Sequence, residues 1–246
     1  MQKMSISQDM KQESAAAISR TSIVSQRLGE PDITFESFHL KKVIGKGSQG
    51  RVYLAELETT GKQYAFKQMR KDVLIEENQI ESTLREQEVL TKLDHPFLCG
   101  LDYTFQNETH LYFAMPFIRG GSIYDRMQNE GRFPEKQAKF YAQQIAVALG
   151  ELHKIKIVHR DLKAENVCID ANGYIKLIDF GLASTKLERL RSFVGTREYM
   201  APELLQQREY GASVDWWALG VLAFEMVYGE TPFCGRNIDE LNSSIK

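Results

Sequence analysis

The sequence predicts an α+β fold, in which a small lobe of strands with one helix precedes a mainly helical lobe. Strand-like runs around glycine turns fill residues 35–116, whereas apolar residues at helical spacing dominate residues 117–246. Residues 1–34 are polar and rich in Ser and Gln, which predicts a disordered tail. We therefore expect three regions, a tail and two lobes, with these boundaries.

The first lobe is expected to hold five strands and one main helix. Its apolar and β-branched runs are bounded by glycines and polar residues. Apolar residues from Ile80 to Leu93 recur at helical spacing and predict the helix. The strands are expected at 38–44, 51–57, 63–67, 101–105 and 111–115.

The second lobe is expected to depend on two long helices. Apolar residues at helical spacing predict an amphipathic helix over 138–152 and a buried helix over 214–227. Short strands at 167–169 and 174–178 flank a turn at Asn172-Gly173, and 155–158 is strand-like. No internal repeat is apparent.

Composition excludes several classes of function. The chain has 246 residues and a net charge of −2, and nothing in this balance suggests binding to nucleic acid or to a membrane surface. Its three cysteines are scattered without a Cys-x-x-Cys pair, so a zinc site or a disulfide framework is not expected. With no membrane segment and no secretory signal in the sequence, we expect a cytoplasmic protein.

A glycine-rich turn is the first candidate for chemistry. Gly45, Gly47 and Gly50 lie between two predicted strands, where backbone N–H groups can approach phosphate because no Cβ blocks them. The strand that follows argues against a dinucleotide-binding fold, in which a helix follows the glycines. Taken alone, the pattern fits an ordinary hairpin turn equally well.

Lys67 follows the apolar run of the third strand, where its ammonium group could meet phosphate oxygens. Such a lysine needs a carboxylate to hold it. Glu86 on the next helix is our choice, although Glu81 and Glu88 remain alternatives because helical phase does not separate them.

The second lobe carries residues suited to phosphoryl transfer. Asp161 can orient an acceptor hydroxyl and take its proton, and Lys163 can neutralise charge on the transferred phosphate. Asn166 and Asp179 offer the oxygen ligands that Mg²⁺ prefers. Each of these motifs alone could be a turn, but their order and spacing together match a phosphoryl-transfer site.

From about Phe35 onward the chain resembles the eukaryotic protein kinases, specifically the serine/threonine kinases of the AGC group, and among them those dependent on cAMP and cGMP. The residues that carry the resemblance are Val43-Ile44-Gly45-Lys46-Gly47-Ser48, Asp94-His95-Pro96-Phe97, Gly120-Gly121, Arg160-Asp161-Leu162-Lys163, Glu165-Asn166, Asp179-Phe180-Gly181, Gly195-Thr196, Glu198-Tyr199, Ala201-Pro202-Glu203 and Asp215-Trp216-Trp217-Ala218-Leu219-Gly220.

The resemblance implies a bilobal fold with a five-stranded antiparallel sheet in the first lobe. It implies ATP and Mg²⁺ as cofactors, with Asp161, Lys163, Lys67 and Glu86 as catalytic residues and Asn166 and Asp179 as metal ligands. The nucleotide-binding residues that it implies are Ile44, Gly45, Lys46, Gly47, Ser48, Gly50, Val52, Ala65, Lys67, Met115, Phe117, Ile118 and Cys168. Because the chain stops soon after the second long helix, we expect the second lobe to lack its final helices.

The resemblance also concerns regulation and substrates. Ser192 falls where an upstream kinase would add an activating phosphate, which would pair with Arg160. Acidic residues at Glu165, Glu198 and Glu225 imply protein substrates with basic residues before the target Ser or Thr. Two departures, Ser122 for an acidic residue and Arg197 for a proline, argue against strict mimicry of that preference.

The leading hypothesis is therefore ATP-dependent phosphorylation of protein serine or threonine hydroxyls in signalling. The alternative is a truncated, inactive kinase fold that binds nucleotide or a partner. A metabolite kinase is disfavoured, because Ala201-Pro202-Glu203 and the segment before it serve protein substrates.

Overall fold

The structure is a computed structural model that describes residues 33–47 and 50–246. Nearly all of the predicted tail, and Ser48 of the glycine turn, lie outside the described residues. The chain divides into two compact units. Within the described residues, unit 1 comprises 33–92 and 100–117, and unit 2 comprises 93–99 and 118–246.

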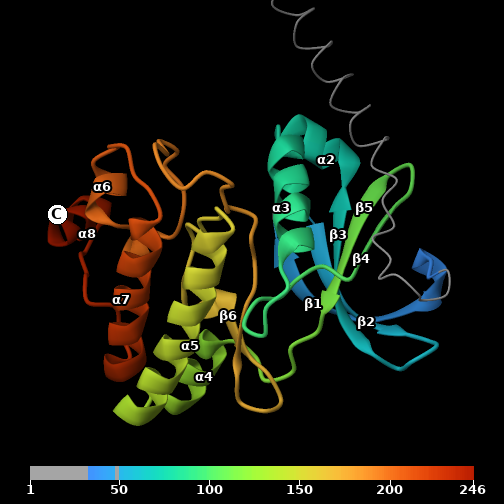
Figure 1. The fold of residues 1–246 in the computed structure, drawn as a ribbon, viewed down its shortest axis with the longest axis horizontal. Coiled ribbons are helices and arrows are strands. Elements are labelled where there is room, and N and C mark those ends of the chain that lie inside the picture. The colour runs from blue at the N-terminus through green and yellow to red at the C-terminus, as the bar shows by residue number, and fades with distance from the viewer. Residues whose placement is uncertain (1–32, 48–49) are drawn as a thin grey trace, which may run out of the picture. The chain divides into compact units, whose positions relative to one another are not determined.

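Unit 1 is built on a five-stranded sheet in the order β1-β2-β3-β5-β4, in which all neighbours are antiparallel (Figure 1). The five strands therefore confirm the predicted antiparallel sheet. The third strand continues three residues beyond Lys67, so this lysine lies inside the strand and not at its end. The strands are β1 (Phe38–Gly47), β2 (Gly50–Leu57), β3 (Gln63–Arg70), β4 (Tyr103–Gln106) and β5 (His110–Pro116).

A short 3-10 turn, η1 (Phe35–Ser37), precedes β1. Two helices, α2 (Lys71–Glu76) and α3 (Ile80–Lys92), follow β3. Ile80, Val89 and Leu90 of α3 are buried, as their helical spacing predicts, and Leu84 is half-buried. A separate core of aromatic side chains, including Phe38, Phe66 and Tyr103, packs on the sheet.

Unit 2 is mainly helical, with one two-stranded sheet, β6-β7. The predicted long helices are α5 and α7. Its elements are α4 (Ile123–Glu130), α5 (Glu135–Lys154), η2 (Ala164–Asn166), β6 (Val167–Ile169), β7 (Ile175–Leu177), η3 (Arg197–Tyr199), α6 (Pro202–Leu205), α7 (Ser213–Tyr228) and α8 (Ile238–Ile245).

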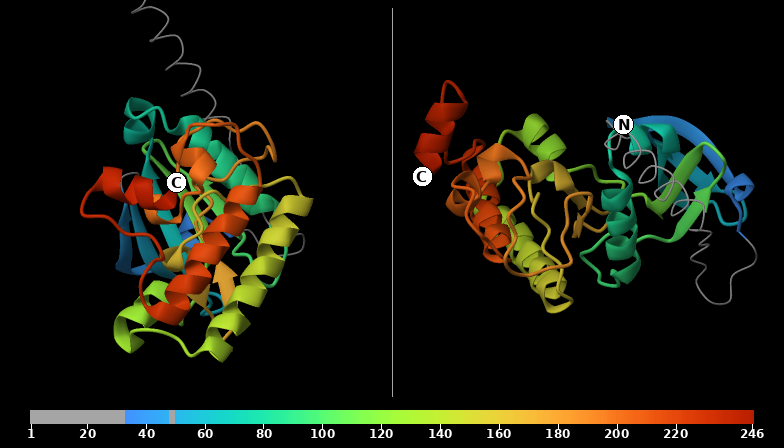
Figure 2. Two further views of the ribbon diagram at one scale, coloured as in Figure 1. Left: turned by 90° about the vertical axis from the view of Figure 1, so that its left-hand side faces the viewer. Right: turned by 90° about the horizontal axis from the view of Figure 1, so that it is seen from above.

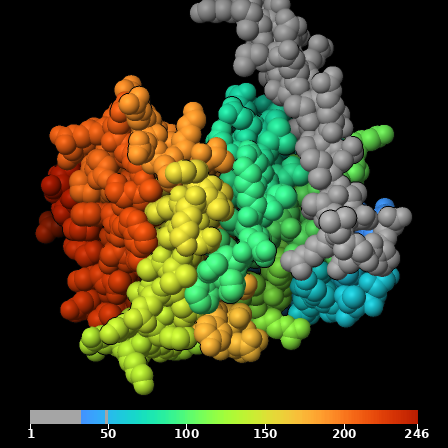
Figure 3. Space-filling model, viewed as in Figure 1, coloured from blue at the N-terminus to red at the C-terminus, as the bar shows by residue number. Residues whose placement is uncertain are grey.

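Helices α5 and α7 run antiparallel and lie side by side (Figure 2). Their side chains meet along the face in Figure 3. Leu149 and Leu152 of α5 and Leu222 of α7 are fully buried. The two helices α5 and α7 thus form much of the core of unit 2.

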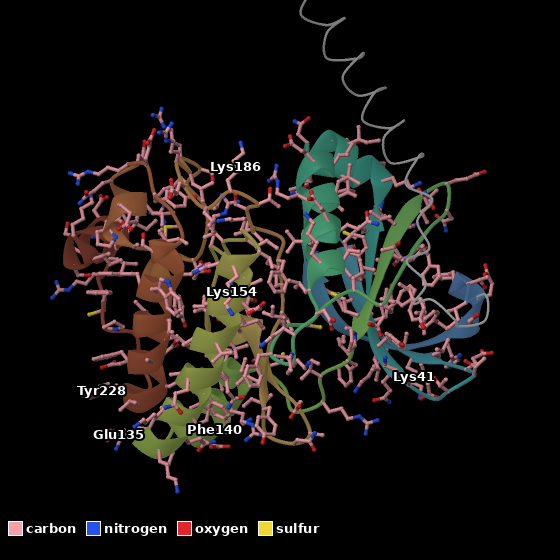
Figure 4. The ribbon with its side chains drawn as sticks, in the orientation of Figure 1. Lys41, Glu135, Phe140, Lys154, Lys186 and Tyr228 are labelled. Carbon is pink, nitrogen blue, oxygen red and sulfur yellow. The ribbon has the colours of Figure 1, made fainter. Side chains whose placement is uncertain are left out.

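One expectation for unit 2 was wrong. Residues 155–158 do not form a strand: Ile157 and Val158 are buried, but Val158 makes an isolated bridge to Ser184 in place of a ladder with a partner strand. Val221 of α7 is buried. Phe224 and Tyr228 do remain exposed and stack at 4.2 Å, and Figure 4 shows Tyr228 at the end of α7 nearest Glu135 of α5.

Among the described helices, none combines the length and apolar character that a membrane crossing requires.

Candidate active site

The glycine turn of unit 1 is a close β1–β2 hairpin. Gly47 pairs with Gly50, and Gly45 pairs with Val52. A Cβ atom at Gly50 would lie 1.9 Å from the backbone oxygen of Gln68 on β3, so a side chain at this position would clash with the neighbouring strand. The packing of the sheet therefore requires glycine at position 50, whether or not a ligand binds there.

The strand register brings several predicted nucleotide-binding residues to one face of the sheet. Val52 pairs with Lys67 in β3, and Ala65 pairs with Met115 in β5. Directly paired residues project to the same face, and so do residues two apart in one strand. One face of the sheet therefore carries the three apolar side chains of Val52, Ala65 and Met115 together with the ammonium group of Lys67.

Lys67 forms an ion pair with Glu86 of α3. Its Nζ lies 2.7 Å and 2.8 Å from the two carboxylate oxygens, and the Glu86 side chain is 3% exposed. The two alternatives have other partners on their own helix: Glu81 pairs with Arg85, and Glu88 pairs with Lys92. The structure thus selects Glu86 among the three candidates as the partner of Lys67.

Asp161 of unit 2 is held by three polar side chains. Thr196 Oγ1 donates to Asp161 Oδ1 at 2.8 Å, and Lys163 Nζ lies 3.0 Å from Oδ2. Asn166 Nδ2 donates to both the backbone oxygen and Oδ2 of Asp161, and Lys163 also donates to Thr196. This network fixes the orientation of the carboxylate, which a general base requires.

The loop that carries Asp161 is anchored from within unit 2 by the buried carboxylate of Asp215. Its oxygens accept hydrogen bonds from the backbone N–H groups of His159 and Arg160, each at 2.9 Å. The Nε2 atom of His153 lies 2.8 Å from Asp215 Oδ2. One residue of α7 thereby holds the loop and the end of α5 together.

Asn166 and Asp179 fit a magnesium site in their donor atoms. Asn166 uses its Nδ2 group for Asp161, which leaves the amide oxygen for a cation, and Asp179 is exposed with Oδ1 accepting from Gly181 N–H. The described residues contain no cluster of three or more His, Cys, Asp or Glu side chains that could hold a metal. Mg²⁺ usually keeps waters and phosphate oxygens, so two protein ligands suit it.

Arg160 and Asp179 also share an unusual backbone conformation, with φ values of 68° and 60°. This left-handed region is uncommon for residues with a side chain and occurs often at functional sites.

Ser192 lies in a polar cluster around Arg160. Arg160 Nη1 donates to Ser192 Oγ at 2.5 Å and to the Tyr210 hydroxyl at 3.3 Å, while Arg160 Nε donates to the backbone oxygen of Leu182. The Tyr210 hydroxyl donates to the backbone oxygen of Ser192 at 2.8 Å. A phosphate on Ser192 would therefore meet a guanidinium group that is already in place.

An acidic cluster lies elsewhere in unit 2. The Tyr199 hydroxyl donates to Glu225, and burial raises the pKa of both groups. The negative charges of Glu165 and Glu198 raise the pKa of Glu225 further, although the Tyr199 hydrogen bond opposes this.

Cys168 lies in β6, and burial, aided by the charge of Asp125, raises the pKa of its thiol to about 11. It is therefore neutral at pH 7 and suited to apolar contact. Phe117 and Ile118 are partly buried, and Phe117 N–H donates to the backbone oxygen of Gln63 in unit 1.

Sequence reasoning missed the roles of Tyr210 and His153. Both side chains act across at least 18 residues of sequence, with no local pattern around them. The sequence indicates Thr196 only as one of the residues that carry the resemblance, yet its hydroxyl donates directly to Asp161.

The family described as protein kinase domain matches residues 38–246, and the chain belongs to it. The predicted assignment to the AGC group is also confirmed, whereas the particular likeness to cAMP- and cGMP-dependent kinases stays a prediction.

Three curated relatives illustrate the similarity. The chain is 43% identical to serine/threonine-protein kinase Sgk3 of Rattus norvegicus, over 88% of this chain and 45% of the relative. It is 42% identical to serine/threonine-protein kinase akt-1 of Caenorhabditis elegans, over 85% of this chain and 39% of the relative. It is 44% identical to protein kinase C delta type of Mus musculus, over 89% of this chain and 33% of the relative. The chain thus spans less than half the length of these relatives.

Proposed function

We propose that this chain transfers the γ-phosphoryl group of ATP to serine or threonine hydroxyls of protein substrates. The network of Thr196, Lys163 and Asn166 around the Asp161 carboxylate is the observation that carries the proposal. Three partners that hold one carboxylate in a fixed orientation suit a group that must accept a proton during transfer.

In this reaction the bond between the β–γ bridging oxygen and the γ-phosphorus breaks, and the substrate oxygen bonds to the same phosphorus. Asp161 accepts the hydroxyl proton, and ADP leaves. Lys163 offsets negative charge on the transferred group, and Lys67, held by Glu86, contacts the remaining phosphates.

Mg²⁺ would be held by Asn166 and Asp179 and would offset the charge of the phosphate oxygens. Ile44, Gly45, Lys46, Gly47, Ser48, Gly50, Val52, Ala65, Met115, Phe117, Ile118 and Cys168 would line the nucleotide site. The shared sheet face of Val52, Ala65 and Met115 supports apolar contact with the adenine ring.

The acidic cluster of Glu165, Glu198 and Glu225 would favour protein substrates that carry basic residues. Burial is the main cause of the raised pKa of Glu225, and the negative charges of Glu165 and Glu198 raise it further. A positive side chain of a substrate would relieve this repulsion, which supports the preference.

The decisive experiment measures phosphate transfer from ATP to a basic serine peptide, with Asp161→Asn as the matched variant. We expect transfer by the parent chain and a loss of about 10²- to 10⁴-fold in the variant. Nucleotide binding without transfer in both proteins would contradict catalysis and favour a binding module instead.

A further inference from the structure

Arg197 and Phe193 form a partly exposed pair in the segment that contacts Asp161. We propose that this pair selects protein substrates with an Asp or Glu side chain directly next to the target hydroxyl. The inference rests on the proposed function and adds a specificity-determining residue to it.

The position of Arg197 follows from its neighbour in the chain. Thr196 donates its hydroxyl proton to Asp161 Oδ1 at 2.8 Å, and Arg197 is the next residue, at the start of η3. A substrate hydroxyl that gives its proton to Asp161 must come close to Thr196. Because consecutive Cα atoms lie about 3.8 Å apart, the residues that flank the target serine come within reach of a long side chain at position 197.

The charge of Arg197 is available to a ligand. In the part of the chain that the structure describes, no carboxylate lies within ion-pair distance of its guanidinium group. Two other arginines of this segment are engaged, since Arg191 pairs with Glu209 and Arg160 donates to Ser192.

The Phe193 ring positions that charge without neutralising it. The guanidinium carbon of Arg197 lies 5.2 Å from the ring centroid, a cation–π distance, and Phe193 is 44% exposed. Stacking on an aromatic face restrains the guanidinium plane and leaves its N–H edge open to a carboxylate, which it can bind through two hydrogen bonds.

The substrate surface of unit 2 would then carry both signs of charge. The acidic cluster of Glu165, Glu198 and Glu225 favours basic residues, whereas Arg197 would repel a basic residue immediately beside the target and attract an acidic one. The expected substrate combines distant basic residues with one adjacent acid.

The test compares six peptides that differ only beside the target serine, with Glu, Ala or Lys directly after it or directly before it. kcat/KM is measured for the parent chain, Arg197→Ala, Arg197→Lys and Arg208→Ala. Arg208 is an exposed arginine of the same unit, outside the proposed site, and serves as the matched control.

On one flank, we expect the parent chain and Arg208→Ala to prefer the Glu peptide to the Lys peptide by about fivefold, with a smaller ratio at high salt. In Arg197→Ala the kcat/KM values for the Glu and Lys peptides should become equal, whereas Arg197→Lys should keep part of the preference for the Glu peptide. Equal ratios in the parent chain and Arg197→Ala at both flanks would overturn the inference.

Binding separates this inference from the proposed function. The same peptides with Ala in place of the target serine, labelled with a fluorophore, are titrated with each protein and followed by anisotropy. Tighter binding of the Glu peptide that depends on Arg197 supports the inference even if no peptide is phosphorylated. Absence of phosphorylation would contradict only the proposed function. Absence of any such preference in binding and in transfer overturns the inference.

Discussion

At the scale of single residues, the Lys67–Glu86 ion pair is the most sheltered charged contact of the proposed site. The two side chains are 19% and 3% exposed. Removal of one partner from such a pair leaves the other charge poorly solvated, at a cost of about 3 kcal/mol. The pair also fixes where the ammonium group of Lys67 points.

Glu86→Gln is expected to lower kcat/KM by about 100-fold, because Lys67 loses its orientation. Steady-state kinetics with ATP and a basic serine peptide would measure this. Glu81→Gln is the control, since the Glu81 side chain is 90% exposed and pairs with Arg85 in α3. Equal losses in both variants would contradict a special role for Glu86.

Ser192→Ala is expected to lower kcat at least tenfold, because a phosphate on Ser192 would bring about two negative charges to Arg160. Turnover would be measured alongside mass spectrometry of residue 192. Thr185→Ala, in the same segment, should have the smaller effect. Unchanged turnover in a Ser192→Ala protein would refute an activating phosphate.

At the scale of secondary-structure elements, α7 supports the loop of Asp161 through one buried carboxylate. Asp215→Asn places an amide nitrogen where a backbone N–H now donates, and leaves a donor unsatisfied. We expect a loss of about 2 kcal/mol in the free energy of unfolding, measured with urea. Asp239→Asn, in the exposed first turn of α8, is the control, and equal midpoints for the two variants would contradict the anchoring role.

Glu225, also on α7, is expected to make the free energy of unfolding depend on pH. Because its pKa is higher in the folded chain than the ordinary value of 4.5, folding takes up protons between these two values. The contribution of Glu225 to the free energy of unfolding therefore falls as pH rises through this interval.

Glu225→Gln keeps an oxygen that accepts from Tyr199 but cannot ionise. We expect this variant to be more stable than the parent chain at pH 7, and the difference to vanish below pH 4.5, as measured by urea denaturation across pH. Glu230→Gln, which alters an exposed carboxylate, should show no such trend. A constant difference at all pH values would rule out the ionisation of Glu225 as its cause.

At the scale of the whole molecule, we propose that binding of ATP with Mg²⁺ depends on residues of unit 1 and on residues of unit 2. A ligand that binds only the folded chain raises the free energy of unfolding by about 2.7 kcal/mol at 100 times its Kd. We expect Mg²⁺ with ATP to raise the melting temperature, and Lys67→Ala in unit 1 and Asp179→Ala in unit 2 each to remove most of the shift. Retention of the full shift in either variant would contradict that residue's role.

Much of the fold was predictable because its signals are local. The glycines between β1 and β2, and the helical spacing in α3, α5 and α7, each lie within one short window of sequence. Membership of the protein kinase family was predictable because the order of the motifs is specific to one class of enzyme, whereas the chemistry at Asp161 stays a prediction.

The remainder depended on contacts between distant residues. Nothing near Tyr210 indicates that its hydroxyl holds Ser192, and nothing near His153 indicates a bond to α7. The 155–158 segment misled because buried apolar residues look like a strand whether or not a partner strand exists. Helical phase likewise could not choose Glu86, since that choice is made by β3.

The anchoring of the loop by Asp215 has a consequence for local motion. Amide protons in a surface loop normally exchange with solvent quickly, but those of His159 and Arg160 are bonded to a buried group of a core helix. Their exchange would require α7 to separate from the loop, so they should persist in deuterated buffer about as long as amides in the middle of that helix. The segment that positions the proposed base would thus behave dynamically as part of the interior.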